Sequence, residues 1–160
     1  MTFKRAPRLN GFDYTGIHRY SLTICTVDRC RAFVSLAAIA PLLVQIQHAA
    51  DAAHFAVIAY CFMPDHLHLL VEGRRDDADL RWFVKILKQR TSYAWKQNQG
   101  SELWQRGYYD RVLRDEEATI DVARYIAANP VRAGIVESPQ DYGLVGSFTM
   151  RMQDLLYSLQ

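Results

Sequence analysis

The stretch of this sequence that decides the fold runs from Tyr60 to Gly73 and reads YCFMPDHLHLLVEG. It consists of two apolar segments around a Met-Pro-Asp turn, and it carries two histidines two residues apart. Since residues i and i+2 of an extended strand point to the same face, His66 and His68 are predicted to project side by side. A strand that only needs to be buried rarely places two titratable rings on one face. The pattern therefore favours a functional site for one divalent metal ion or one phosphate.

Outward from this stretch, the sequence predicts an alternation of strands and helices. Strands are expected at residues 20–27, 54–62, 66–71 and 111–114, and helices at 36–53, 79–97 and from 115 or 116 to 129. Residues 130–147 are expected to be loop-like, before a last short helix at 150–159. The order strand-helix-strand-strand-helix-strand-helix is that of a ferredoxin-like α+β sandwich. It predicts a four-stranded antiparallel sheet with helices packed on one face, plus a C-terminal helix that carries Tyr125.

Polar residues and prolines indicate where these helices begin and end. Ser35 precedes the first helix as an N-cap, and the loop at 73–79 ends in residues that cap helices well. Pro41 fits the first helix only near its start, because proline removes a backbone donor from a helix interior. Pro130 is expected to stop the third helix, since the residue before a proline disfavours helical backbone angles.

The composition is that of a globular protein with one domain. The 160 residues are 50% hydrophobic and 22% charged, which provides enough apolar material for an ordinary core. We predict a single domain over 1–160, with its core at about 18–147 between a short N-terminal arm and a C-terminal tail. The first residues lack the apolar segment of a signal peptide, and the longest apolar runs are too short to span a bilayer. The three cysteines form no CxxC pair and are expected to be reduced thiols of a cytoplasmic protein.

Positive charge is concentrated in two parts of the chain. Residues 1–31 carry six Lys or Arg and two Asp (net +4), and residues 81–114 carry eight Lys or Arg against one Glu and one Asp (net +6). Residues 32–73 contain neither Lys nor Arg. This segregation favours a basic surface that binds nucleic acid by tracking its phosphates. The predicted DNA contacts are Arg5, Arg8, Arg81, Lys85, Lys88 and Arg90.

Aromatic side chains are interleaved with the basic residues of the same region. Aromatic faces can stack unpaired bases while neighbouring basic side chains contact phosphates. The alternative is that core segments simply lack charge, and that at least half of these aromatics belong to the core. The residues concerned are Trp82, Tyr93, Trp95, Trp104, Tyr108 and Tyr109.

The histidine pair admits three interpretations. As a metal pair, the two rings supply neutral nitrogen ligands and leave further positions for oxygen ligands and substrate. As a direct phosphate-binding pair they would be similar to histidine-triad hydrolases, but the third alternating position is Leu70. They could also be two hydrogen-bonded structural histidines. A zinc deaminase is disfavoured, because no H-x-E with a later P-C-x-x-C is present.

A second candidate element lies on the third predicted helix. Tyr125 and Asn129 are four residues apart and are therefore expected to be neighbours on one helical face. A tyrosine hydroxyl can act as a nucleophile that forms a covalent intermediate. The carboxamide oxygen of Asn129 could complete a metal shell begun by the two histidines. The simpler alternatives are an amphipathic core tyrosine and an asparagine that ends a helix before proline.

These residues together resemble the single-tyrosine transposases of the HUH superfamily, which are IS200/IS605-like, and in particular the REP-associated tyrosine transposases. The resemblance rests on MPDHLHLLV at 63–71 and on YIAANPV at 125–131, and it covers roughly residues 18–147. Trp104, Tyr109-Asp110 and Ala133-Gly134 also match. The combination of the two motifs is specific, unlike either motif alone.

The resemblance implies a DNA transposase that cleaves and rejoins single-stranded, hairpin-bearing DNA through a 5′-phosphotyrosine. It implies Tyr125 as the catalytic nucleophile, and His66, His68 and Asn129 as ligands of Mg²⁺ or Mn²⁺. Asp65 stands where asparagine or glutamate is frequent in the family, and its side chain is expected to face away from the histidines. Tyr125 could meet the histidines of its own chain or those of a partner copy in a homodimer.

Two other functions stay open from the sequence. One is a domesticated protein that binds hairpin DNA without cleaving it, although the presence of both histidines and Tyr125 counts against it. The other is a metal-dependent phosphodiesterase that uses water as its nucleophile, with Tyr125 in a structural role. That enzyme would turn over without any covalent protein–DNA species.

Overall fold

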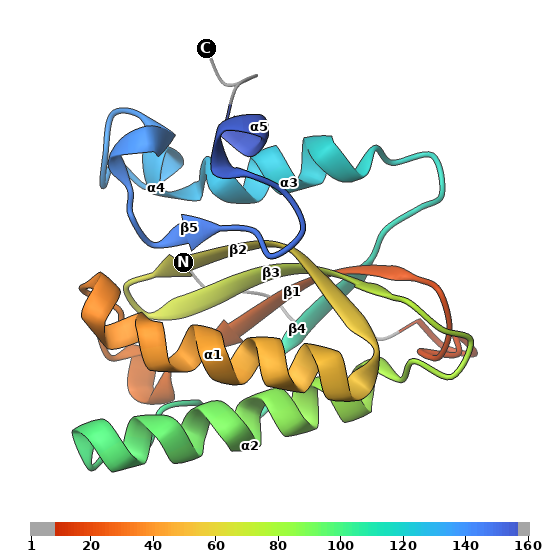
Figure 1. The fold of residues 1–160 in the computed structure, drawn as a ribbon, viewed down its shortest axis with the longest axis horizontal. Coiled ribbons are helices and arrows are strands. Elements are labelled where there is room, and N and C mark those ends of the chain that lie inside the picture. The colour runs from red at the N-terminus through yellow and green to blue at the C-terminus, as the bar shows by residue number, and fades with distance from the viewer. Residues whose placement is uncertain (1–8, 157–160) are drawn as a thin grey trace.

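The fold is built on one five-stranded antiparallel sheet, seen in a computed structural model that describes residues 9–156 (Figure 1). The strand order is β4-β1-β3-β2-β5. The strands are β1 (Arg19–Cys25), β2 (Phe55–Met63), β3 (His66–Gly73), β4 (Tyr109–Val112) and β5 (Val145–Gly146). The four longer strands confirm the predicted ferredoxin-like sheet, and β5 extends it by two residues beside β2.

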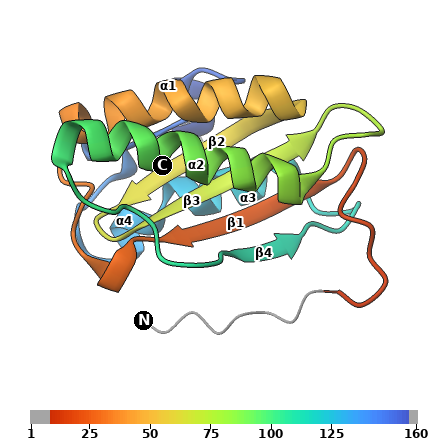
Figure 2. The same ribbon diagram turned by 90° about the horizontal axis from the view of Figure 1, so that it is seen from below.

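Two long helices cover one face of this sheet. Figures 1 and 2 show α1 (Leu36–Ala53) and α2 (Leu80–Gln99) running side by side across it. The hydroxyl of Ser35 accepts a hydrogen bond from the amide of Ala38, which confirms the predicted N-cap of α1. Asp79 caps α2 in the same way, and Gly100 ends it in the left-handed conformation that glycine adopts without strain.

Three shorter helices lie on the other face, above the sheet in Figure 1. They are α3 (Thr119–Ala127), α4 (Asn129–Arg132) and α5 (Met152–Leu156). The prediction of helices on one face is therefore right for α1 and α2 but incomplete, because the helix that carries Tyr125 packs on the opposite face. A second apolar cluster forms there between the sheet, α3 and α5, and it includes Ile58, Leu70, Ala123, Ile126 and Leu155.

The region after residue 115 differs from the prediction in two ways. The helix expected at 115–129 begins later, at Thr119, and is divided at Ala128. Pro130 does not end it but lies in the first turn of α4, where proline is tolerated because no intrahelical donor is needed. Residues 130–147 are not a plain loop, since they contain most of α4, the 3-10 turn η2 (Pro139–Asp141) and β5.

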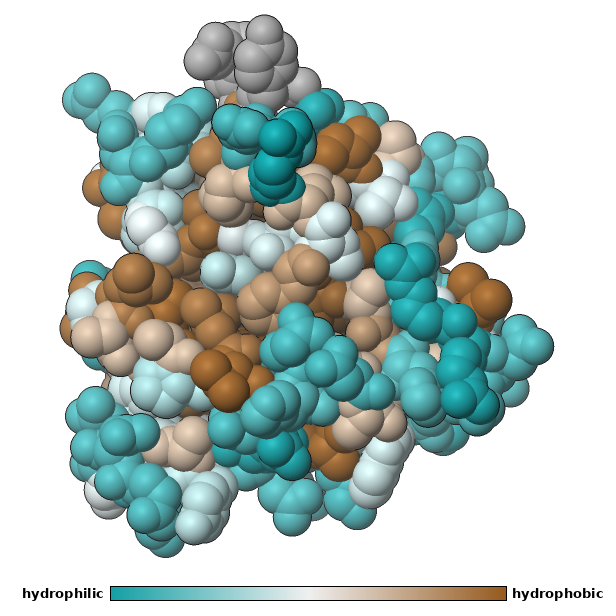
Figure 3. Space-filling view, viewed as in Figure 1, coloured by the Kyte–Doolittle hydropathy of each residue, from teal (hydrophilic) through white to brown (hydrophobic). Residues whose placement is uncertain are grey.

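The outer surface of α1 is unusually apolar. Figure 3 shows apolar side chains grouped over this part of the molecule, and Leu36 and Val44 are both more than half exposed. Among the described residues, α1 is the one helix whose length and mean hydropathy of 1.2 would suffice to cross a membrane. Its inner side, however, packs against α2 and β2 through Ile39, Leu42 and Ile46, as a core helix does.

Candidate active site

The side chains of β3 point alternately to the two faces of the sheet, so one set belongs to the core and the other to the candidate site. Leu67 and Leu69 are fully buried against α1 and α2. His66 and His68 point to the other face, because successive residues of a strand point to opposite sides. Their cross-strand neighbours on that face are Cys25 and Thr23 of β1 and Cys61 and Met63 of β2. The predicted projection of the two histidines to one face is therefore confirmed.

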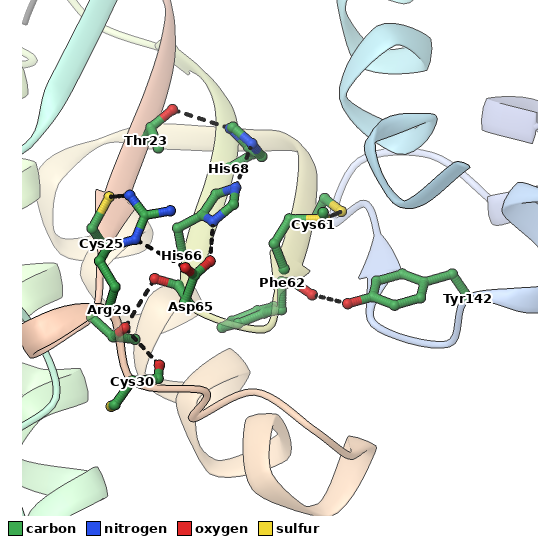
Figure 4. Close-up of polar contacts among 12 residues, drawn as sticks. Thr23, Cys25, Arg29, Cys30, Cys61, Phe62, Asp65, His66, His68 and Tyr142 are labelled. Carbon is green, nitrogen blue, oxygen red and sulfur yellow. Dashed lines mark hydrogen bonds and ion pairs between the residues drawn. The ribbon is translucent and has the colours of Figure 1, made fainter. Parts of the chain in front are cut away.

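The two imidazoles meet through their outer nitrogens, as Figure 4 shows. Their Nε2 atoms lie 3.1 Å apart, and the ring planes are nearly perpendicular at 89°. The Nδ1 atom of His66 lies 2.6 Å from Oδ1 of Asp65, and Nδ1 of His68 lies 3.1 Å from the hydroxyl of Thr23. Each ring is thus oriented by a polar partner on the side away from the shared contact, which is how metal-binding histidines are usually held.

Asp65 is where the structure overturns a prediction. Its side chain was expected to face away from the histidines, but Oδ1 contacts His66 while Oδ2 accepts a hydrogen bond from Nε of Arg29 at 3.0 Å. The strand alternation does not apply to Asp65, because it lies in the turn between β2 and β3. We assign the proton to Nδ1 of His66, since a carboxylate can only accept. Nε2 of His66 then presents its lone pair to the site.

The turn that supplies Arg29 is held in a strained backbone conformation. Asp28 and Arg29 both have positive φ angles, 50° and 54°, which are uncommon for residues other than glycine. The amide of Thr26 donates to the carbonyl oxygen of Asp65 at 3.0 Å. These contacts attach the short helix η1 (Val27–Arg29) to the Asp65 turn. They place a guanidinium beside the carboxylate that orients His66.

Electrostatics keep both histidines neutral near pH 7. Burial lowers the pKa of His68 to about 3, and the nearby His66 and Arg132 add to this effect. Burial also lowers the pKa of His66, although its contact with Asp65 opposes the shift. Burial alone would raise the pKa of Asp65, but hydrogen bonds from Arg29 and His66 outweigh it and lower that pKa. Two neutral rings beside an ionised carboxylate are a suitable donor set for a divalent cation.

The separation of the two Nε2 atoms also fits a single metal ion. Two nitrogen ligands about 2.1 Å from one ion and about 90° apart would be separated by roughly 3.0 Å. The observed 3.1 Å is close to this value. Within residues 9–156, no group of three His, Cys, Asp or Glu could hold a metal. A carboxamide oxygen is a ligand type that divalent cations such as Mg²⁺ and Mn²⁺ accept beside imidazole.

Tyr125 and Asn129 lie on the histidine side of the sheet. The helices that carry them, α3 and α4, both pack against β2, which adjoins the histidine strand. Tyr125 is 64% exposed, so its side chain is accessible from outside the protein. The amide nitrogen of Asn129 donates to the carbonyl of Ile126 at 3.1 Å, and its oxygen accepts from Arg132 at 2.8 Å. A carboxamide oxygen has two lone pairs, so this contact leaves it able to accept a second partner.

Two residues of this site, Thr23 and Arg132, were missed from the sequence. Thr23 could have been found from the strand register, which places it directly opposite His68. Arg132 lies three residues after Asn129 and seven after Tyr125, which is helical spacing, and its guanidinium carbon lies 3.7 Å from the centre of the Tyr125 ring. Arg29 also fits the family pattern in the sequence, but its contact with Asp65 could not be predicted, because it depends on the positive φ angles of its turn.

The basic residues of α2 are separated from the histidines by the sheet. Lys88 donates to the carbonyl oxygens of Gln105 and Gly107 at 2.9 and 2.8 Å, and Arg90 binds side chains of α1. Arg81 pairs with Asp79, and Lys85 lies 5.8 Å from the ring of Trp82. Arg5 and Arg8 lie outside the described residues. DNA binding by this set stays a prediction.

Half of the six aromatic residues belong to the core or pack against it, as the simpler alternative predicted. Trp95 and Trp104 are buried, and Nε1 of Trp104 donates to the hydroxyl of Thr91 at 2.8 Å. Tyr108 packs at the edge of the same core. Trp82 and Tyr93 are exposed on the outer side of α2. Tyr109 is half-buried on β4, so Trp82 and Tyr93 are the members of the set that are most open to a nucleic acid base.

Comparison with known proteins agrees with this geometry. The family model of IS200-like transposases matches residues 17–129, a span that contains the histidine pair, Tyr125 and Asn129. A Haemophilus influenzae protein named as a candidate REP-associated tyrosine transposase is 25% identical over 143 residues, which cover 81% of this chain and 80% of that protein.

Two solved structures share the fold. One is a REP-associated tyrosine transposase bound to a REP hairpin, with a TM-score of 0.70 at 18% identity over 91% of this chain and 82% of that one. The other is assigned as a transposase from Deinococcus radiodurans R1, with a TM-score of 0.55 at 22% identity over 72% of this chain and 93% of that one. With its fold, its histidine pair and a family match over most of its length, the chain belongs to the IS200-like transposase family.

Proposed function

We propose that this protein cleaves and rejoins single-stranded DNA that contains a hairpin, with Tyr125 as the nucleophile and a divalent metal ion at the histidine pair. The observation that carries the proposal is the convergence of two oriented Nε2 atoms, 3.1 Å apart, on the face that also carries the exposed Tyr125. Asp65 behind one ring and Thr23 behind the other is also the kind of arrangement that orients metal-binding histidines. The related transposase bound to a REP hairpin supports a hairpin as the substrate class.

In the proposed reaction the tyrosine oxygen replaces a deoxyribose oxygen on phosphorus. The Tyr125 hydroxyl loses its proton and its oxygen attacks the scissile phosphate, forming a 5′-phosphotyrosine. The bond between phosphorus and the 3′ oxygen breaks, and that oxygen takes up a proton to become a free 3′-hydroxyl. Because one phosphoester replaces another, a second 3′-hydroxyl can reverse the step and join a different strand without ATP.

His66 and His68 would hold the metal ion, and the carboxamide oxygen of Asn129 is the proposed third protein ligand. When bound, Mg²⁺ or Mn²⁺ would supply a positive charge that stabilises the charge developing on the phosphate oxygens. Asp65 and Thr23 hold the two rings with their Nε2 atoms directed at the same point, and the proton that one Nε2 shares with the other would leave when the metal binds. Arg29 keeps the Asp65 carboxylate ionised and in position.

The deciding experiment is a denaturing gel of the protein incubated with Mn²⁺ and end-labelled hairpin oligonucleotides from the DNA that flanks its gene. We expect a slowly migrating covalent species that is absent in Tyr125→Phe. Tyr93→Phe is the matched control, because Tyr93 is similarly exposed, at 70%, but lies on α2 across the sheet. Both variants should bind the hairpin as the unmodified protein does.

Two results would replace the proposal with one of its alternatives. Cleavage without any adduct, equal in Tyr125→Phe, would indicate a phosphodiesterase that uses water. Hairpin binding under native conditions without cleavage would indicate a domesticated DNA-binding protein. Mixing Tyr125→Phe with His68→Ala provides a further test, since recovered cleavage would show that the site is shared between two copies in a dimer.

A further inference from the structure

Arg132 connects the residues that the proposed reaction depends on. Its guanidinium carbon lies 3.7 Å from the centre of the Tyr125 ring, which is direct contact. One of its terminal nitrogens donates to Oδ1 of Asn129 at 2.8 Å. The same side chain therefore contacts the proposed nucleophile and the proposed third metal ligand, although it lies just beyond the stretch that matches the family model.

We propose that Arg132 is a positioning residue of strand transfer, which fixes Tyr125 and Asn129 relative to each other and donates to an oxygen of the DNA phosphate beside them. This inference rests on the proposed function. A guanidinium that lies over an aromatic ring keeps its N–H donors in its own plane, directed outward. It has five such donors, and the contact with Asn129 uses one. Arg132 is exposed, so a phosphate can reach the others.

The charge of Arg132 also reaches the metal site. Its guanidinium donates to Oδ1 of Asn129, the proposed third ligand, and so places a positive charge beside the oxygen that would bind the cation. Repulsion between that charge and the cation weakens binding of the cation at this oxygen. A bound DNA phosphate would neutralise Arg132 and remove this repulsion. Metal and DNA should therefore each strengthen the binding of the other, and Arg132 should carry part of that coupling.

The test compares Arg132→Ala and Arg132→Lys with the unmodified full-length protein. Arg75→Ala is the matched control, because Arg75 is an exposed arginine in the loop after β3, with Asp77 as its ion-pair partner. The first measurement is the rate of adduct formation at saturating hairpin and Mn²⁺. The second is the affinity for Mn²⁺ by titration calorimetry, with and without hairpin, in a Tyr125→Phe background that prevents cleavage. Circular dichroism confirms that each variant is folded.

We expect Arg132→Ala to lower the adduct rate about ten- to a hundredfold, the effect of losing a hydrogen bond from a charged group. Added guanidinium chloride at millimolar concentration should restore part of this rate, whereas Arg132→Lys should remain impaired because it lacks the planar fork. Without DNA, Arg132→Ala should bind Mn²⁺ at least as tightly as the unmodified protein. The increase in Mn²⁺ affinity caused by the hairpin should be smaller.

An adduct rate within about twofold of the unmodified protein would overturn the inference, as would a folded Arg132→Ala that guanidinium does not rescue. If the unmodified protein forms no adduct at all, the proposed function fails separately. The hairpin affinity then still decides the role of Arg132. Equal affinity in Arg132→Ala excludes the phosphate contact, and weaker affinity than in Arg75→Ala supports it.

Discussion

The two faces of the sheet differ in what covers them and in what they do. One face is closed by α1 and α2, and its strand residues, such as Leu67 and Leu69, are completely buried. The other face is covered by the shorter helices α3, α4 and α5 and keeps a polar group of residues around His66 and His68. The same strand therefore contributes to the core on one side and presents the proposed metal ligands on the other. The period of two along β3 makes this division possible, since adjacent residues take different roles.

The sharpest test of this division uses neighbouring residues of β3. Leu69→Ala should lower the free energy of unfolding by about 2–5 kcal/mol, because it leaves a cavity in the fully buried face. His68→Ala should cost only about 1 kcal/mol, the worth of its hydrogen bond to Thr23, but should abolish adduct formation. Urea denaturation and the adduct gel measure the two effects. Loss of stability and retained cleavage in His68→Ala would contradict the assignment of the two faces.

Thiol reactivity measures how tightly α3 closes the histidine face. Cys61 is fully buried there and its pKa is raised to about 12 by burial, whereas Cys30 is exposed. A raised pKa means that the reactive thiolate of Cys61 is scarce at pH 8 and increases only as the pH approaches 12. We expect iodoacetamide at pH 8 to label Cys61 at least about a hundredfold more slowly than Cys30.

Mass spectrometry of peptides from the native protein gives both labelling rates at once. Cys25 serves as the internal control, since it is also buried and its pKa is also raised by burial. Rapid labelling of Cys61 alone would show that α3 separates from the sheet in solution. The helices on the histidine face would then be more mobile than α1 and α2 on the opposite face.

The orienting role of Asp65 should show in metal affinity. Asp65→Ala removes the carboxylate that holds Nδ1 of His66, and such changes behind a metal ligand typically weaken binding about 10- to 100-fold. Asp65→Asn keeps a hydrogen-bond acceptor but loses the negative charge, so its affinity for Mn²⁺ should lie between those of Asp65→Ala and the unmodified protein. Titration calorimetry with Mn²⁺ measures both variants against Asp77→Ala, an exposed aspartate with an arginine partner of its own. Unchanged Mn²⁺ affinity in Asp65→Ala would mean that His66 is oriented by packing alone.

The smallest effect is expected on the α1 and α2 face. Arg81→Ala and Lys85→Ala each remove an exposed charge on the side of the sheet away from the histidines. Each should weaken hairpin binding only a few-fold. The slope of the logarithm of the binding constant against the logarithm of the salt concentration should become smaller by about one. Neither should change the adduct rate at saturating DNA. Filter binding at several salt concentrations measures the hairpin affinity and its salt dependence, and the denaturing gel measures the adduct rate. A lower rate at saturation would show that DNA on α2 acts on the distant site, contrary to the division between the faces.

Much of the fold could be predicted from local patterns. The caps at Ser35 and Asp79, the alternation in β1 and the apolar run of β2 all depend on neighbours in the chain, and the structure confirms the elements they predict. The two-residue strand β5 could not be predicted, because it exists only where the edge of β2 supplies hydrogen-bond partners. The placement of α3 on the second face likewise depends on contacts with distant strands.

The sequence by itself determined that His66 and His68 share one face, because that follows from strand geometry, and its two motifs identified the family. Only the tertiary structure decided what surrounds them. Asp65 turns toward His66 because a strained turn far away in the sequence brings Arg29 to it. Tyr125 lies on the same side of the sheet as the histidines because α3 packs against β2 and β3, which are distant from it in the sequence. Such contacts depend on where distant segments pack, and local periodicity carries no information about that.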